Sequence, residues 1–165
     1  MNRPSNIHLA VERADDAFND WNALLALIQS AFAYMEARID PPSSLRLLNP
    51  ATLAAKADKE VLFYIRSSSG LIGCAFAHVR SDCVYVGKVS IATDQQGKGI
   101  GRRLMQACEA LALERGKRKV EIQVRVELTE NQLFFRTLGF VKTGETAHAG
   151  YDRPTSITMR KRLNP

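Results

Sequence analysis

The segment Gln96-Gly97-Lys98-Gly99-Ile100-Gly101-Arg102 has the residue types and spacing of an anion-binding loop. It lies between a strand-like apolar stretch and a stretch with helical periodicity. Because glycine has no β-carbon, successive backbone N–H groups can turn toward one anion, and the dipole of a following helix adds to their field. Lys98 and Arg102 add positive charge. The segment therefore predicts a site for a phosphate-bearing ligand.

Two common phosphate-binding patterns do not describe this loop. The GxGxxG spacing of a dinucleotide-binding fold is absent, and no acidic residue closes a second βαβ unit. A Walker A loop is excluded because no Gly-Lys-Ser/Thr follows at the required offset. The alternative is that the glycines only ease a tight turn, which leaves Lys98 and Arg102 unexplained.

The formal net charge of +6 is concentrated around this loop. Residues 1–60 carry six basic and eight acidic side chains, whereas residues 98–119 carry seven basic side chains against Glu109 and Glu114. Such a local excess suits one polyanionic ligand. A nucleic-acid binder usually interleaves aromatic side chains with its basic ones, and residues 98–119 contain none. We therefore expect no nucleic-acid partner.

The elements that must position the loop can be placed from hydrophobic periodicity and turn residues. A short edge strand is expected at residues 6–11. A helix capped by Asp15 or Asp16 should run to about Met35, and a second, capped by Asn49, should cover residues 50–58. Later helices are expected at 99–116 and from a Thr129 cap to 138. The remaining strands are expected at residues 61–65, 71–79, 84–92, 119–126, 140–146 and 156–163.

The strand at 84–92 changes its apolar phase in the middle. Val84 and Val86 share one face, whereas Val89 and Ile91 lie on the other. Since side chains in a strand alternate with period two, both pairs can be buried on one face only if an extra residue intervenes. The pattern predicts a β-bulge at residues 87–89.

Composition and element order indicate one α/β domain over residues 1–165, with a mostly antiparallel sheet and some parallel pairing. No stretch reaches the roughly 18 uninterrupted apolar residues of a membrane span, so we expect a cytoplasmic protein with no membrane partner. The three cysteines, Cys74, Cys83 and Cys108, have neither metal-site nor disulfide-framework spacing, which suggests thiols in a reducing compartment and no bound metal.

Two motifs together resemble the GNAT N-acetyltransferase superfamily. Gln96-x-x-Gly99-x-Gly101, after a strand ending Val89-Ser90-Ile91, is similar to the family's pyrophosphate loop, and the segment 134–140 is similar to its Phe-Tyr-x-x-x-Gly-Phe motif. The resemblance covers about residues 7–163. It implies a central sheet of six to seven strands, about four flanking helices, a bulged strand beside a V-shaped cleft, acetyl-CoA as acetyl donor, and a homodimer by the family's habit.

The resemblance also implies the cofactor contacts. The backbone of the bulged strand would bind the pantetheine arm, and the N–H of Val89 would stabilise the oxyanion formed when an amine attacks the thioester. On a later helix the family has a tyrosine where this chain has Phe135, and the position of its asparagine is Leu128 here. The implied cofactor residues are Val89, Ser90, Ile91, Gln96, Gly97, Lys98, Gly99, Ile100, Gly101, Arg102, Asn131 and Phe135.

Two proton transfers then need side chains. Glu127 is the candidate general base, although it could instead pair with Arg125; His148 and His78 are further candidates. Tyr151 is the candidate acid for the departing thiolate, or else a packing aromatic. The acceptor is expected to contact Tyr34, Arg38, Asp40 and Arg125, where Asp40 could hold a cationic amine and Arg38 a carboxylate, or either could brace the Pro41-Pro42 turn.

The resemblance therefore implies an N-acetyltransferase that acts on a primary amine of a small molecule or peptide. The amine would attack acetyl-CoA directly in a ternary complex. The alternative is a catalytically weak module that binds or senses acyl-CoA, because the tyrosine is absent at Phe135.

Overall fold

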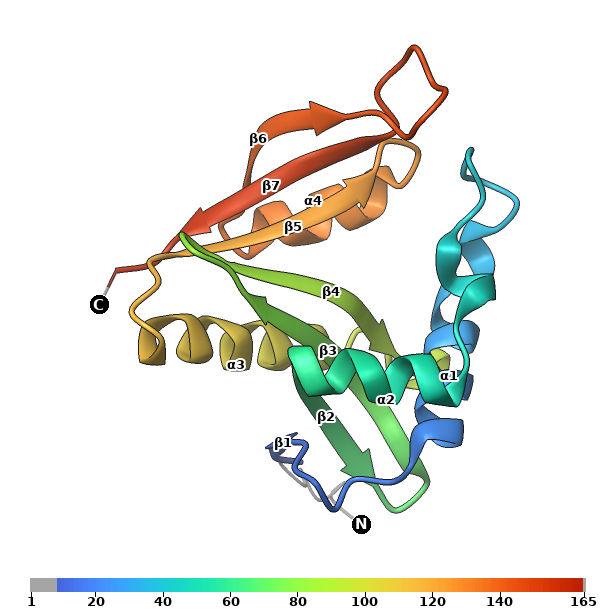
Figure 1. Cartoon of the computed structure of the whole chain (residues 1–165), viewed down its shortest axis with the longest axis vertical. Coiled ribbons are helices and arrows are strands. Elements are labelled where there is room, and N and C mark those ends of the chain that lie inside the picture. The colour runs from blue at the N-terminus through green and yellow to red at the C-terminus, as the bar shows by residue number, and fades with distance from the viewer. Residues whose placement is uncertain (1–8, 165) are drawn as a thin grey trace, which may run out of the picture.

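The computed structural model describes residues 9–164, which form one seven-stranded sheet in the order β1-β2-β3-β4-β5-β7-β6 (Figure 1). Neighbouring strands are antiparallel except for the parallel pair β4 and β5. The strands are β1 (Val11–Arg13), β2 (Val61–Ser67), β3 (Gly70–Val79), β4 (Val84–Ile91), β5 (Lys119–Arg125), β6 (Val141–Thr146) and β7 (Ser156–Arg162). The helices are α1 (Trp21–Phe32), α2 (Pro50–Lys59), α3 (Ile100–Glu114) and α4 (Thr129–Thr137). The predicted fold class is confirmed.

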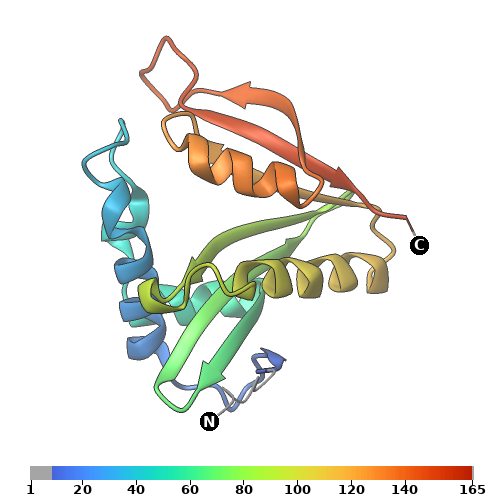
Figure 2. The same ribbon diagram turned by 180° about the vertical axis from the view of Figure 1, so that it is seen from behind.

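Helices cover both faces of the β2–β4 part of the sheet (Figures 1 and 2). Side chains of β3 alternate between the two layers, because Cys74 and Phe76 pack with α1 and α2 whereas Ala75 and Ala77 pack with α3. Burial raises the pKa of Cys74 to about 12. This thiol therefore stays protonated in the core.

Local sequence signals explain some helix ends but not others. At α2, Asn49 Oδ1 accepts from Thr52 N and Thr52 Oγ1 accepts from Asn49 N, both at 2.9 Å, which forms the expected cap. The Asp15 or Asp16 cap of α1 was a wrong prediction: the helix begins after Asp20, and Asp15 Oδ1 accepts from Ala17 N in a turn before it.

Two further boundaries differ from the expected ones. Thr129 is the first residue of α4 rather than its cap, because Leu128 occupies the cap position without a side-chain hydrogen bond. Of the expected strand at 6–11, residues 6–8 lie outside the described residues, and the strand that pairs with β2 is Val11–Arg13. Pairing with β2 selects this register.

The predicted bulge in β4 is present. Cys74 of β3 pairs with Ser90 and Phe76 pairs with Gly87, so Lys88 and Val89 together oppose one residue, and Lys88 has a φ of 54°. Parallel pairing between β4 and β5 is limited to two residue pairs that start at Val84. Beyond them the strands diverge, and the two arms of the molecule form a V (Figures 1 and 2). Cavities lie on both sides of the point where β4 and β5 diverge, so the predicted V-shaped cleft is present.

In the part of the chain that the structure covers, no helix combines the length and apolar character needed to cross a membrane.

Candidate active site

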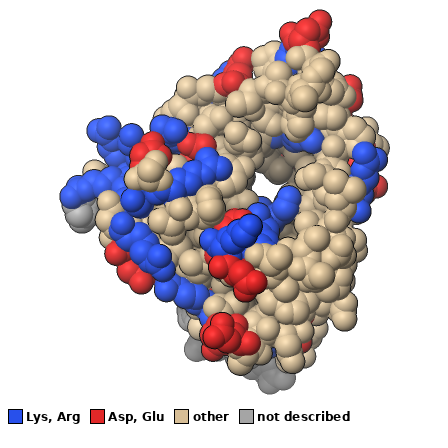
Figure 3. All heavy atoms as spheres, viewed as in Figure 1, with Lys and Arg blue, Asp and Glu red and all other residues tan. Residues whose placement is uncertain are grey.

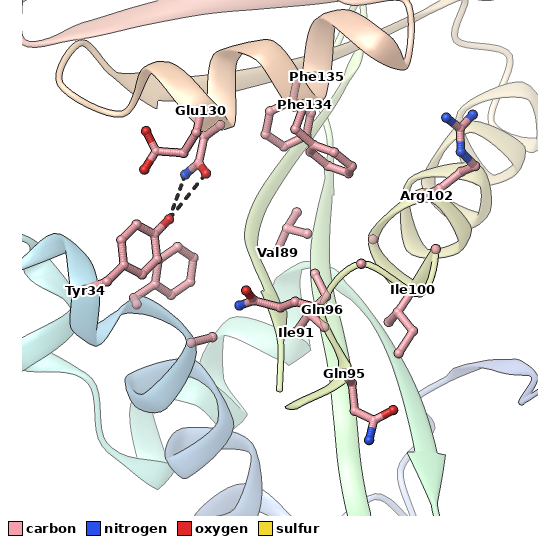
Figure 4. Close-up of a pocket in the computed structure, with 16 residues that line it drawn as sticks. Tyr34, Val89, Ile91, Gln95, Gln96, Ile100, Arg102, Glu130, Phe134 and Phe135 are labelled. Carbon is pink, nitrogen blue, oxygen red and sulfur yellow. Dashed lines mark hydrogen bonds between the residues drawn. The ribbon is translucent and has the colours of Figure 1, made fainter. Parts of the chain in front are cut away.

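Two cavities meet where β4 and β5 diverge. The glycine-loop cavity has a volume of about 540 Å³ and is lined by α1, β4, the 95–102 loop and α4 (Figure 4). The β5-side cavity has a volume of about 700 Å³ and is lined by β4, β5, the 42–47 segment and the loop after β6. Both are lined by Phe32, Val89, Asn131 and Phe135. A ligand in one cavity can therefore reach a ligand in the other at this junction.

The glycine loop presents free backbone donors to its cavity. Gly97 and Gly99 have φ values of 77° and 81°, in the left-handed region that glycine adopts without strain, and Gly99 caps α3. The amides of residues 100–102 have no hydrogen-bond partner among the described residues, and the next amide, of Arg103, donates to Gly99 O at 3.1 Å. Unpaired amides at a helix N-terminus form an anion site.

Gly101 also has a packing role that the sequence did not indicate. A β-carbon at this position would lie 3.1 Å from Phe134 Cζ and 3.4 Å from Ile91 Cδ1. The absence of a side chain therefore lets the start of α3 approach α4 and β4 closely.

Most residues predicted to bind the cofactor line the glycine-loop cavity. Ser90 and Lys98 do not: Ser90 is buried and its Oγ donates to Lys88 O at 2.9 Å, while Lys98 Nζ donates to Gln95 Oε1 at 3.3 Å. Those that line it are Val89, Ile91, Gln96, Gly97, Gly99, Ile100, Gly101, Arg102, Asn131 and Phe135.

Tyr34, expected at the acceptor, lies instead in the glycine-loop cavity. Asn131 Nδ2 donates to the Tyr34 hydroxyl at 2.9 Å, and this hydroxyl donates to Asn131 Oδ1 at 3.3 Å, across the space between the segment after α1 and α4 (Figure 4). Asn131 and Phe135 are one helical turn apart on α4. The Tyr34 hydroxyl is therefore bonded to α4 one helical turn before Phe135.

Arg38 and Asp40, expected at the acceptor, line neither cavity, and each is engaged in an ion pair. Arg38 Nη2 donates to Glu130 Oε2 at 2.9 Å, and this bond lowers the pKa of Glu130 to about 2. Asp40 accepts from the Tyr151 hydroxyl at 2.6 Å and from Arg153 Nη2 at 3.2 Å.

Glu127 and Tyr151 belong to the same polar network, outside the residues that line the two cavities. Glu127 Oε1 lies 3.8 Å from Arg153 Nη1, so its ion-pair partner is Arg153 rather than Arg125. The hydrogen bond to Asp40 raises the pKa of Tyr151. This network joins the segment after α1 to the loop between β6 and β7 at the open end of the V.

The β5-side cavity contains a different set of ionisable groups. Arg125, the last residue of β5, and His148, in the loop after β6, both line it, whereas His78 lines neither cavity. Partial desolvation and then the charge of Arg125 lower the pKa of His148, while Glu127 opposes them. His148 is therefore neutral at neutral pH.

Sequence reasoning missed several lining residues. Phe134 could have been found from helical spacing, since it lies three positions after Asn131 on the same face. Phe32 carried only a core-like signal. Lys88 lines the β5-side cavity because the bulge redirects it, and periodicity does not give that direction. Within residues 9–164 no group of three His, Cys, Asp or Glu side chains could hold a metal ion.

Comparison with known proteins agrees with this geometry. Residues 21–140 match the family model "Acetyltransferase (GNAT) family". The fold is similar to PaiA N-acetyltransferase from Thermoplasma acidophilum, solved with coenzyme A (TM-score 0.77, 14% identity, 94% of this chain and 100% of that chain covered). It is also similar to a GNAT family acetyltransferase from Elizabethkingia anophelis with acetyl-CoA bound (TM-score 0.67, 15% identity, 95% and 99% covered).

A third similar structure is the ribosomal-protein-S18-alanine N-acetyltransferase from Escherichia coli (TM-score 0.64, 17% identity, 94% and 96% covered). At such identities the solved structures show a shared fold, whereas the family model matches most of the chain. The chain belongs to the GNAT acetyltransferase family.

Proposed function

We propose that this protein transfers the acetyl group of acetyl-CoA to a primary amine of a small molecule or peptide. The observation that carries the proposal is the junction of the two cavities at Val89. The glycine-loop cavity offers free amides for a pyrophosphate, and the β5-side cavity leaves room for an acceptor. Two of the similar structures hold coenzyme A or acetyl-CoA, which supports the same ligand here.

The reaction would run at that junction. The lone pair of a neutral amine attacks the thioester carbonyl, the C–S bond breaks, the amine loses a proton, and the thiolate gains one. Val89 lies in the bulge, outside the regular register with β3, so its N–H is proposed to donate to the developing oxyanion. Such a donor lowers a barrier by about 3 kcal/mol.

For the amine proton, the geometry favours His148 over Glu127 as the base, because His148 lines the β5-side cavity and Glu127 does not. Thr155 Oγ1 donates to Thr146 O at 3.4 Å and lies within hydrogen-bond reach of His148 Nδ1. Thr155 Oγ1 also accepts from His148 N at 2.9 Å. We propose the tautomer in which Nδ1 donates to the same oxygen, which leaves Nε2 to accept the amine proton.

The pH dependence of kcat tests this assignment. Because the pKa of His148 is lowered, the base should stay neutral, and kcat constant, until the pH falls below about 6.5, the ordinary histidine value. His148→Gln should lower kcat about 100-fold and remove this acid limb. Glu127→Gln, measured in parallel, should keep the limb; if Glu127→Gln removes it and His148→Gln does not, Glu127 is the base.

For the thiolate, we propose Tyr34 as the proton donor. Tyr34 lines the glycine-loop cavity, and its hydroxyl accepts from Asn131 Nδ2 at 2.9 Å. It donates to Asn131 Oδ1 only over 3.3 Å, a long bond to a neutral oxygen that a thiolate can replace. Tyr151, the donor expected from the sequence, points its hydroxyl at Asp40. A thiol pKa of about 8.5 makes the thiolate a fair leaving group. Proton donation by Tyr34 therefore lowers the barrier less than the oxyanion donor does.

Thermal unfolding with acetyl-CoA tests the cofactor proposal without any acceptor. A ligand at 100 times its Kd adds about 2.7 kcal/mol, which for a chain of this size raises Tm by roughly 5 to 10 °C. We expect this shift with acetyl-CoA and a smaller one with dephospho-CoA. No shift at millimolar acetyl-CoA would overturn the proposal.

The second candidate function, an acyl-CoA-binding module without turnover, rests on Phe135 in place of tyrosine. It shares the thermal shift but predicts no release of CoA thiol with any amine. A thiol-release assay over a panel of amines separates the two.

A further inference from the structure

The β5-side cavity is positively charged. Its charged lining residues are Arg46, Lys56, Lys88 and Arg125, and no Asp or Glu among the described residues lines it. Lys56 forms an ion pair with Glu60, with Nζ 2.7 Å from Oε2. Within residues 9–164 the other three form no ion pair. In Figure 3, Lys and Arg atoms lie at the edge of the opening between the two arms.

Arg125 is the member of this set with an unmet bonding requirement. Its Nη2 donates only to Pro42 O, at 3.4 Å, and its Nη1 is buried without a hydrogen-bond partner among the described residues. Desolvation lowers the pKa of Arg125 in spite of the nearby Glu127, Tyr151 and Asp40, which act in the opposite direction. A buried guanidinium N–H without an acceptor costs free energy that an anionic ligand would recover.

Lys88 places a second charge beside the reacting position. It precedes Val89 in the bulge, and burial together with the like charge of Lys56 lowers its pKa, against the influence of Glu60. A cation here repels an ammonium group and so favours the neutral amine that the reaction needs. Of the carboxylates that could attract a cationic acceptor, Asp40 is paired with Arg153, and Glu127 has Oε1 3.8 Å from Arg153 while its Oε2 is buried without a hydrogen-bond partner among the described residues. Neither residue lines the cavity.

The rest of the lining is part polar and part apolar. The apolar side chains come from α1 and the segment after it, the 42–47 segment, β4, β5 and the residue before α4: Phe32, Met35, Leu45, Leu47, Val86, Ile122, Val124 and Leu128. The cavity thus combines one buried guanidinium donor with a hydrophobic surface. A carboxylate can accept hydrogen bonds from the guanidinium group of Arg125, and an apolar group of the same ligand can pack against the apolar lining residues.

We propose that the acceptor is a small amine that carries a carboxylate and an apolar group, as an amino acid does, and that Arg125 binds the carboxylate. This inference rests on the proposed acetyl transfer and names its substrate class. It excludes polyamines and other acceptors whose only charges are positive.

The test compares matched acceptors that differ only in the carboxylate. Leucine, methionine and phenylalanine are assayed against their amides by release of CoA thiol, with spermidine and O-phosphoethanolamine as further arms. Converting the carboxylate to an amide lowers the pKa of the neighbouring amine, so a larger fraction of the amide substrate carries a neutral, reactive amine. A preference of the enzyme for the acid must therefore come from binding of the carboxylate. We expect kcat/KM for the preferred acid to exceed that of its amide by about 10-fold or more.

Arg125→Gln should reduce this acid-to-amide ratio to near one, mainly through KM for the acid. Arg162→Gln is the matched control. In the β5–β7 register Arg162 lies opposite Lys119, at the other end of β5 from Arg125, so this variant should keep the wild-type ratio. Both rates in the acid-to-amide ratio are measured on the same variant. A partial loss of folded protein would lower both rates equally and leave the ratio unchanged.

The outcomes separate this inference from the proposed function. If acetyl-CoA shifts Tm but amides, spermidine or O-phosphoethanolamine are used as well as the acids, or no acid is used at 10 mM, the carboxylate assignment is overturned and acetyl transfer stands. An unchanged ratio in Arg125→Gln also overturns it. Absence of any Tm shift with acetyl-CoA rejects the function itself.

Discussion

Gly99→Val should abolish the thermal stabilisation by acetyl-CoA while the unliganded protein still folds. Gly99 has a φ of 81°, and a β-carbon added at this position would meet no atom within 4 Å, so the substitution causes backbone strain rather than a clash. A β-branched residue is strongly disfavoured at this φ. The loop must relax by changing its dihedral angles, which turns the amides of residues 100–102 away from the position proposed for the pyrophosphate.

The expected loss of affinity is about 100-fold or more, since several charge-assisted hydrogen bonds are weakened together. Titration calorimetry with acetyl-CoA measures it directly. Gly116→Val provides a matched control, because Gly116 follows α3, has a φ of 70° and is equally open. It should lower Tm by a similar amount but leave affinity for acetyl-CoA intact. Wild-type affinity in Gly99→Val would show that the loop does not hold the phosphates.

The parts of the site that could be predicted are those encoded locally. The glycine spacing identifies the loop because positive φ and a helix N-terminus are properties of a few consecutive residues. The phase change around Gly87 identifies the bulge for the same reason, since a period-two pattern cannot change faces without an inserted residue. These two local features indicated the glycine loop at the start of α3 and the point where β4 departs from β5.

The side chains at the open end could not be predicted, because their partners are distant in sequence. Asp40 and Tyr151 are bonded across 111 positions, and Tyr34 and Asn131 across 97. Glu127 was a candidate base because it follows β5, but its ion pair with Arg153 depends on how the last loop folds back. Hydrophobic periodicity gives the face of a helix or strand on which a residue lies. It does not give the distant residue with which its side chain forms a hydrogen bond or ion pair.

The acid assignment makes a second strong prediction. Tyr34→Phe should lower kcat about 10- to 100-fold, toward the smaller end of general-acid effects because a thiolate leaves fairly well. KM for acetyl-CoA should change little, since the hydroxyl is proposed to act on the leaving thiolate. Tyr151→Phe, which removes a hydroxyl bonded to Asp40 instead, should retain kcat within a few-fold. Steady-state kinetics on both variants checks this contrast.

Phe135→Tyr distinguishes proton donation from support of Asn131. Phe135 lines both cavities one turn from Asn131, so a hydroxyl there can reach the junction from α4 instead of α1. In the Tyr34→Phe background we expect Phe135→Tyr to recover most of kcat, although Asn131 still lacks its Tyr34 partner. If the double variant stays as slow as Tyr34→Phe alone, Tyr34 acts by holding Asn131. If Tyr34→Phe leaves kcat unchanged, the thiolate departs without an acid from this chain.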